Sequence, residues 1–271
     1  MSLYDMERLD KLLVNKELVE TREKAQRLIM AGLVKVDGII QTKCGHKFPE
    51  ELKIEISGSG MPYVSRGGLK LEKAIYEFSI DFKDKIILDI GASTGGFTDC
   101  VLQFGAKKVY AMDVGYGQLH YRLRNDKRVV LIEKFNARDI DENTLPEKVD
   151  LITIDVSFIS LSKIIPSAIK VLKENGEVIA LIKPQFETDK KYVEKGGVVR
   201  KSSTHKTVLN NIVDIVKSNN LTIKGLTQSP IKGPSGNIEF LIYCKYKDKS
   251  QPLEITNELL ELVTQASCLL L

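Results

Sequence analysis

The chain has 271 residues, of which 43% are hydrophobic and 28% charged, and its formal net charge is +4. This length is enough for one large domain and one small one, and a mean hydropathy of −0.10 is typical of a soluble globular protein. The small positive charge permits a polyanionic partner without demanding one.

The cysteines and the N-terminal sequence argue against several classes of protein. The four cysteines have no paired spacing, so neither a disulfide framework nor a zinc site is predicted. Charged residues stand near the N-terminus where a signal peptide needs an apolar core, and no apolar run reaches membrane-spanning length. We therefore expect a cytoplasmic protein with no bound metal and no stable membrane insertion.

The first part of the chain, residues 1–58, is predicted to be a small α+β unit. Thr21 is a good N-cap for its second helix, and Gly32 ends that helix. Asp37-Gly38 is a hairpin turn between two short apolar runs. The expected elements are helices at 6–14 and 21–30 and strands at 33–36, from 39, and at 53–56. A linker is expected at 59–66, within a segment rich in glycine and serine.

Apolar runs alternate with amphipathic stretches over residues 67–247, which predicts a parallel sheet covered by helices. A hairpin, 221–226 and 238–246, is expected to close the sheet. The tail, 248–271, contains one amphipathic helix at 255–266. The other expected strands are 86–90, 109–112, 129–133, 151–154 and 178–182, and the expected helices are 68–77, 97–104, 164–172 and 204–218.

A glycine-rich turn follows the first of these strands, in Asp89-Ile-Gly-Ala-Ser-Thr-Gly-Gly-Phe97. Glycines there let the backbone approach a ligand at the carboxyl end of a strand. The pattern is neither Gly-x-Gly-x-x-Gly nor a phosphate loop. Asp89, together with Asp113 at the end of the next apolar run, suits a ligand with a cation and a ribose diol, and S-adenosylmethionine has both. The alternative is a tight strand–helix turn with no ligand.

Four polar residues stand where an α/β domain usually places its active site. Asp155 and Lys183 each follow a predicted strand, Lys70 opens the first helix, and Glu239 begins the last strand. Each one alone could equally be the solvated end of an element. Together they suit methyl transfer to a hydroxyl: one lysine, disfavoured as an ammonium by the charge of the other, accepts the proton, and the carboxylates orient both.

The residues present argue against two other kinds of methyl acceptor. Asp155-Val-Ser-Phe158 lacks the Asp/Asn-Pro-Pro-aromatic pattern of amino-group methylases. No cysteine follows a proline in the position that cytosine C5 methylases use as their nucleophile. Cys100 and Cys244 are therefore interpreted as core residues.

The charge of the N-terminal unit is balanced, with ten basic and ten acidic residues in 1–60. Net charge therefore gives no support for nucleic-acid binding. Only a cluster of Arg8, Lys11, Arg22 and Lys35 on one face would support it.

Several ordered motifs resemble known families. Arg8-Leu-Asp-Lys-Leu-Leu, with Thr21-Arg-x-x-Ala-x-x-Leu-Ile and Val-x-Val-Asp-Gly, resembles the S4 RNA-binding domain, although Asp37 stands where that family more often has Asn. Tyr63-Val-Ser-Arg-Gly-Gly-Leu-Lys-Leu, the glycine loop, Lys183-Pro-Gln-Phe-Glu and Gly233-Pro-Ser-Gly-Asn-x-Glu-Phe resemble the TlyA family. That family joins an S4 domain to a domain similar to the FtsJ ribose methyltransferases. The resemblance covers residues 5 to 246 and leaves the tail unexplained.

The resemblance implies a class I, Rossmann-like α/β methyltransferase with a mixed seven-stranded sheet, preceded by an S4-like domain. It also implies S-adenosylmethionine-dependent 2′-O-methylation of cytidine in ribosomal RNA, with rRNA or ribosomal subunits as partners. The catalytic tetrad would be Lys70, Asp155, Lys183 and Glu239. The cofactor site would use Asp89, Gly91, Ala92, Ser93, Gly95, Gly96, Phe97, Asp113 and Asn136. RNA would contact Arg8, Lys11, Arg22, Lys35 and Arg66.

Two alternatives from other classes remain open. Members of this family are often labelled haemolysins, and the helix at 255–266 could bind a membrane interface. The absence of a spanning segment and of an export signal argues against that activity. The other alternative is a noncatalytic ribosome-assembly factor that retains the fold.

Overall fold

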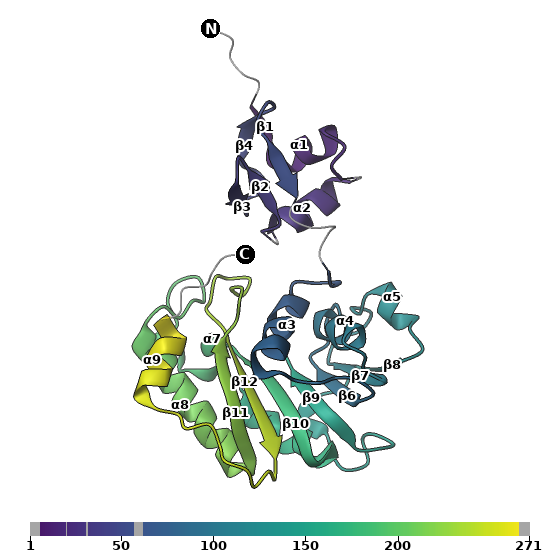
Figure 1. Ribbon diagram of the computed structural model, residues 1–271, viewed down its shortest axis with the longest axis vertical. Helices are drawn as coiled ribbons and strands as arrows, with labels where there is room; N and C mark the ends of the chain where they lie inside the picture. The colour runs from purple at the N-terminus through teal and green to yellow at the C-terminus, as the bar shows by residue number, and fades with distance from the viewer. Residues whose placement is uncertain (1–5, 20, 31, 57–61, 266–271) are drawn as a thin grey trace. The chain divides into compact units, whose positions relative to one another are not determined.

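The computed structural model describes residues 6–19, 21–30, 32–56 and 62–265 (Figure 1). Contacts between Cα atoms divide the chain into two compact units, with the boundary between Pro62 and Tyr63. The expected linker at 59–66 falls partly outside the described residues, because 57–61 are not among them. The N-terminal unit has one hydrophobic core, and the larger unit has two.

The N-terminal unit packs two helices against short strands. Strand β2 is the centre of an antiparallel sheet with the order β3-β2-β5, and β1 pairs with β4. Leu9, Leu13 and Ile29 are fully buried in the core of this unit. Its elements are β1 (Met6–Arg8), α1 (Leu9–Asn15), α2 (Arg22–Met30), β2 (Val34–Val36), β3 (Ile39–Gln41), β4 (Lys47–Pro49) and β5 (Ile54–Ile56).

The expected helix over 6–14 is wrong at its start. Met6–Arg8 form a strand because they pair with Lys47–Pro49, a strand that the local pattern did not predict. The expected turn is confirmed: Asp37 and Gly38 both have positive φ, 48° and 78°, as a two-residue hairpin of type I′ requires. The Thr21 hydroxyl accepts a hydrogen bond from the backbone N–H of Lys24 at 3.2 Å, as expected of an N-cap.

The larger unit contains a seven-stranded mixed sheet with the order β11-β12-β10-β9-β6-β7-β8. Strand β12 lies antiparallel to β11, which confirms the predicted hairpin. Strand β12 also lies antiparallel to β10, so it is placed between β10 and β11 in the sheet. The remaining neighbours are parallel. The strands are β6 (Ile86–Ile90), β7 (Lys108–Asp113), β8 (Val129–Glu133), β9 (Val149–Ile154), β10 (Leu172–Ile182), β11 (Leu221–Gln228) and β12 (Phe240–Tyr246).

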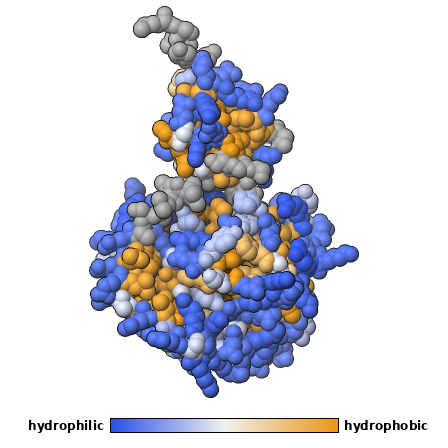
Figure 2. Space-filling model, in the orientation of Figure 1, coloured by the Kyte–Doolittle hydropathy of each residue, from blue (hydrophilic) through white to orange (hydrophobic). Residues whose placement is uncertain are grey.

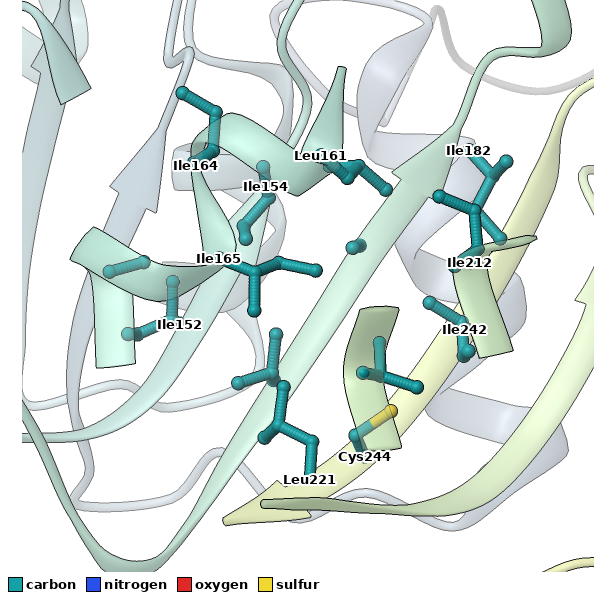
Figure 3. Close-up of a cluster of buried hydrophobic side chains, with 14 of the residues drawn as sticks. Ile152, Ile154, Leu161, Ile164, Ile165, Ile182, Ile212, Leu221, Ile242 and Cys244 are labelled. Atoms are coloured by element: carbon teal, nitrogen blue, oxygen red, sulfur yellow. The ribbon is translucent and has the colours of Figure 1, made fainter. Parts of the chain in front are cut away.

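Helices cover both faces of this sheet. Successive strand residues point to opposite faces, so Leu151 and Ile179 join the core on the side of α3 (Gly67–Phe78) and α4 (Gly96–Gln103). Ala180 joins the other core, as does Ile152, which is labelled in Figure 3. That second core is covered by α6 (Ile165–Ala168), α8 (Ser202–Ser218) and α9 (Asn257–Gln265). Cys100 and Cys244 are buried core residues, as predicted.

The expected helix over 164–172 is wrong at its end. It divides into α6 and a 3-10 turn, η3 (Ile169–Val171), because Leu172 already pairs with Val149 in the sheet. The remaining short elements were not predicted: α5 (Tyr121–Arg124), α7 (Pro184–Glu187), η1 (Ala137–Asp139), η2 (Leu161–Lys163) and η4 (Lys190–Tyr192).

Hydrophilic residues cover much of the face of the larger unit that is visible in Figure 2. Within the described ranges, no helix is long and apolar enough to cross a membrane.

Candidate active site

The carboxyl ends of the central strands meet at one edge of the sheet. Because β9 and β10 are parallel neighbours, Asp155 and Lys183 follow them at the same edge. Strand β12 runs the other way and pairs Phe240 with Ile182. Lys183 follows Ile182 and Glu239 precedes Phe240, so these two residues are neighbours at the end of the β10–β12 pair. Strand register therefore brings Asp155, Lys183 and Glu239 to the same edge of the sheet.

The four predicted catalytic residues form two ion pairs. Lys183 Nζ lies 2.6 Å from Asp155 Oδ1 and also donates a hydrogen bond to Ser157 Oγ at 2.9 Å. Lys70 Nζ, on α3, donates to Glu239 Oε2 at 2.6 Å, and both of these side chains are buried. Among the described residues, Glu239 Oε1 is buried without a hydrogen-bond partner. Asp155 Oδ1 is also buried, and its contact is the ion pair with Lys183.

The turn before β12 holds Glu239 in place. A Cβ on Gly233 would lie 2.3 Å from Glu239 Oε1, so a larger residue there would displace this carboxylate. The fully buried Asn237 accepts a hydrogen bond from the backbone N–H of Val199 and donates to the carbonyl of Gly197, both at 2.8 Å. Sequence reasoning missed these supporting residues and Ser157. The Gly-Pro-Ser-Gly-Asn run signalled the turn but not its contact with Glu239.

The glycine loop after β6 is as tight as its sequence predicted. Gly91 has φ +84°, and a Cβ there would lie 2.4 Å from the carbonyl oxygen of Asp155. Gly95 has φ +98°, and a Cβ on Gly96 would lie 2.3 Å from Ser65 Oγ. The beginning of the loop therefore packs against Asp155, and the start of α4 packs against the segment before α3.

A cavity of about 700 Å³ opens beside this loop, a size typical of small-molecule sites. Its lining includes two acidic residues, Asp113 and Asp155, and residues of the glycine loop. Apolar residues such as Met112 and Phe135 complete the wall. Asp113 accepts hydrogen bonds from the backbone N–H groups of Ser93 at 2.8 Å and Gly115 at 2.7 Å, which fixes its carboxylate at the wall. The predicted site residues that line the cavity are Gly91, Ser93, Asp113, Asn136 and Asp155.

Other predicted cofactor residues do not line this cavity. Ala92 and Phe97 are buried in the core on the α3 and α4 side, and Gly95 and Gly96 shape the loop. Asp89 is fully buried, and its carboxylate accepts hydrogen bonds from the hydroxyls of Thr98 at 2.6 Å and Thr153 at 2.8 Å. Asp89 thus ties β6 to α4 and β9. Burial raises its pKa to about 6.

The titration of Asp89 predicts a pH-dependent stability. Because its pKa is raised from the usual 3.8, the native state binds the proton more tightly than the unfolded state, so this group stabilises the fold at acidic pH. That contribution is lost as pH rises from about 4 to about 6, a change of about 3 kcal/mol.

Urea unfolding of the wild type and of Asp89→Asn, at pH values from 4 to 7.5, measures this effect. The free energy of unfolding of the wild type, relative to the variant, should fall over that window and be constant above it. A difference that does not change with pH would contradict the expectation.

The predicted RNA-contacting residues are distributed over both units. Arg8 and Arg22 both bond to Asp10, and Lys11 lies 3.7 Å from Glu7. The other two predicted residues lie elsewhere: Lys35 is on β2, and Arg66, before α3, donates to the carbonyl of Lys232 at 2.6 Å. The structure therefore brings together Arg8 and Arg22, and no recorded contact in the described residues joins Lys35 to them.

Comparison with known proteins identifies a family for each unit. The FtsJ-like methyltransferase family matches residues 63–246, and the S4 domain matches residues 7–51. Hemolysin A of Brachyspira hyodysenteriae is 48% identical over 237 residues, covering 87% of this chain and 98% of that protein. The 16S/23S rRNA (cytidine-2′-O)-methyltransferase TlyA of Mycobacterium tuberculosis is 37% identical over 239 residues, covering 88% of this chain and 89% of that protein.

A solved structure from Streptococcus thermophilus, described as a candidate hemolysin, is similar over almost the whole chain. It is 43% identical, with a TM-score of 0.74, and the match covers 97% of this chain and 96% of that one. Membership of a methyltransferase family confirms the expected enzyme class and, with it, the expected methyl donor, S-adenosylmethionine. The chain therefore belongs to the TlyA family, in which an S4 domain precedes an FtsJ-like methyltransferase domain.

Proposed function

We propose that this protein methylates the 2′-hydroxyl of cytidine in ribosomal RNA, using S-adenosylmethionine. The observation that carries the proposal is the pair of lysine–carboxylate contacts, Lys183 with Asp155 and Lys70 with Glu239, at the sheet edge. The relative TlyA, which is named for cytidine 2′-O-methylation of 16S and 23S rRNA, supports the choice of acceptor.

S-adenosylmethionine supplies an electrophilic methyl group bound to sulfur. Lys183, as the amine, accepts the proton of the ribose 2′-hydroxyl while that oxygen forms its bond to the methyl carbon, and the bond between this carbon and sulfur breaks. Asp155 and Ser157 hold the Lys183 nitrogen in one orientation. Lys70, fixed by Glu239, orients the hydroxyl.

The cavity beside the glycine loop suits the methyl donor. In this proposal Asp113 accepts hydrogen bonds from the two ribose hydroxyls of the cofactor, and Asn136 lies near the adenine. The backbone of Gly91 and Ser93 faces the methionine part. The carboxylate of Asp113 and the apolar side chains of Met112 and Phe135 in the cavity wall support this arrangement.

The N-terminal unit, residues 1–58, is proposed to bind RNA as an S4-like domain, joined by a linker at 59–66 to the methyltransferase domain at 67–247 and the tail at 248–271. The division of contacts at Pro62 supports this organisation. Ribosomal subunits in the cytoplasm are the proposed partners.

Transfer of a labelled methyl group tests the proposal. Purified protein and labelled S-adenosylmethionine are incubated with small and large ribosomal subunits from cells that lack this protein. The expected result is incorporation into rRNA and resistance to alkaline cleavage at a cytidine, because a 2′-O-methyl group removes the attacking hydroxyl. Cofactor binding without transfer to either subunit would favour the noncatalytic assembly factor. Leakage of liposomes caused by the protein alone would favour the haemolysin.

A further inference from the structure

Asp10, near the start of α1, is a fully buried carboxylate that organises two arginines. Its Oδ1 accepts a hydrogen bond from Arg8 Nε at 3.0 Å, and its Oδ2 accepts from Arg8 Nη2 at 2.9 Å. The same Oδ2 accepts from Arg22 Nε and from Gln26 Nε2, each at 2.9 Å. The bond from Arg8 holds the pKa of this carboxyl well below its usual range, so Asp10 is charged at neutral pH.

The outer sides of both arginines face solvent. Their side chains are 37% and 46% exposed, although each is bonded to a buried group. Within the described residues, neither Nη nitrogen of Arg22 nor Nη1 of Arg8 makes a recorded hydrogen bond. Gly45 leaves room beside Arg8, since a Cβ there would lie 3.1 Å from Nη1. The cluster therefore presents directional N–H donors with a net charge of one positive unit, which suits a phosphate.

We propose that Asp10 is a positioning residue for RNA binding, which orders Arg8 and Arg22 before RNA arrives so that their outer nitrogens bind a backbone phosphate. This inference rests on the proposed function, because it takes RNA as the substrate. The three side chains come from β1, α1 and α2, and Asp10 joins all three elements. Without it, two like-charged and flexible side chains would have to be ordered at the moment of binding, which lowers affinity.

Asp10→Asn distinguishes a positioning role from an effect of net charge, because the two explanations predict opposite changes in RNA affinity. The variant removes a negative charge beneath a basic surface, so net charge alone would strengthen RNA binding. Positioning predicts binding weaker by about tenfold, since both arginines lose their fixed orientation. Filter binding of the full chain to transcripts of small- and large-subunit rRNA, over a salt series, measures this difference.

Glu55→Gln is the matched control. It removes one negative charge from the same unit, at an exposed pair with Lys53, and should leave RNA affinity unchanged or raise it. For Asp10→Asn, the expected effect is on KM for rRNA, with kcat at saturating RNA unchanged, because Asp10 belongs to the N-terminal unit and is not a member of the catalytic tetrad. A fall in kcat with KM unchanged, or RNA binding as tight as that of the wild type, would overturn the inference.

A second variant decides the question if Asp10→Asn does not fold, as judged by circular dichroism. Arg22→Lys keeps the charge but has a single nitrogen, which cannot bond Asp10 and present a separate donor pair to phosphate, so it should also weaken binding. Unchanged binding by Arg22→Lys would refute the proposal. Either variant could lose activity on intact ribosomal subunits and still bind protein-free rRNA normally. The arginines would then contact a ribosomal protein rather than RNA, which also contradicts the proposal. Absence of wild-type transfer to any rRNA would instead remove the proposed function itself.

Discussion

Lys183→Ala should lower kcat for methyl transfer by about 10²–10⁴-fold, the usual contribution of a positioned general base. Lys183 Nζ is held by Asp155 at 2.6 Å and by Ser157 at 2.9 Å, so no other side chain replaces it at that point without movement. KM for rRNA should change little, because Lys183 acts on the reacting hydroxyl. The measurement is initial rates of labelled transfer at saturating rRNA and cofactor.

Lys173→Ala is the matched control for this experiment. Lys173 lies near the opposite end of the same strand, β10, and also pairs with a carboxylate, Asp150 Oδ1, at 2.7 Å. Its loss removes an equal charge and a similar ion pair without touching the site, so kcat should be retained. Full activity in a folded Lys183→Ala protein would refute the proposed mechanism.

Gly91→Ala should weaken the binding of S-adenosylmethionine by about tenfold or more, because inserting a methyl group into a closely packed site costs about 1–3 kcal/mol. The added Cβ would lie 2.4 Å from the Asp155 carbonyl oxygen, a backbone atom that cannot rotate away. The left-handed φ of +84° adds strain of about 1–2 kcal/mol for any residue with a side chain. Isothermal titration calorimetry with S-adenosylmethionine gives the affinity directly, and kcat should fall as well because Asp155 moves.

Gly117→Ala distinguishes the effect of the steric clash with Asp155 from the effect of backbone strain. Gly117 also has a left-handed φ, +72°, but a Cβ there would meet no atom within 4 Å. This variant should lose some stability and keep its cofactor affinity. Equal losses of affinity in the two variants would show that backbone strain, rather than contact with Asp155, explains the effect of Gly91→Ala.

Much of the fold could be predicted because its signals are local. The β-branched runs at Ile86–Ile90 and Val129–Glu133 form strands with the expected bounds, and the Asp37-Gly38 turn has the expected dihedral angles. The start of the chain could not be predicted in this way. Met6–Arg8 have helical spacing, yet pairing with a strand about forty residues later decides their conformation.

The candidate site shows the same division. Asp155 and Lys183 could be placed together from sequence because parallel strands share a carboxyl edge. Asp89 shows what local spacing misses, since the hydroxyls of Thr98 and Thr153 both donate hydrogen bonds to its carboxylate. Those threonines come from different elements, so no local spacing could reveal them.

By itself, the sequence determined the α/β class, the position of the glycine loop and the identity of the four polar residues, because helix and strand periods and glycine turns depend on neighbours along the chain. Only the tertiary structure decided that Lys70 pairs with Glu239, that Gly233 packs against that carboxylate, and that Asp10 holds Arg8 and Arg22. These contacts join residues from separate elements. They exist only after long-range strand pairing and core packing have placed those elements side by side.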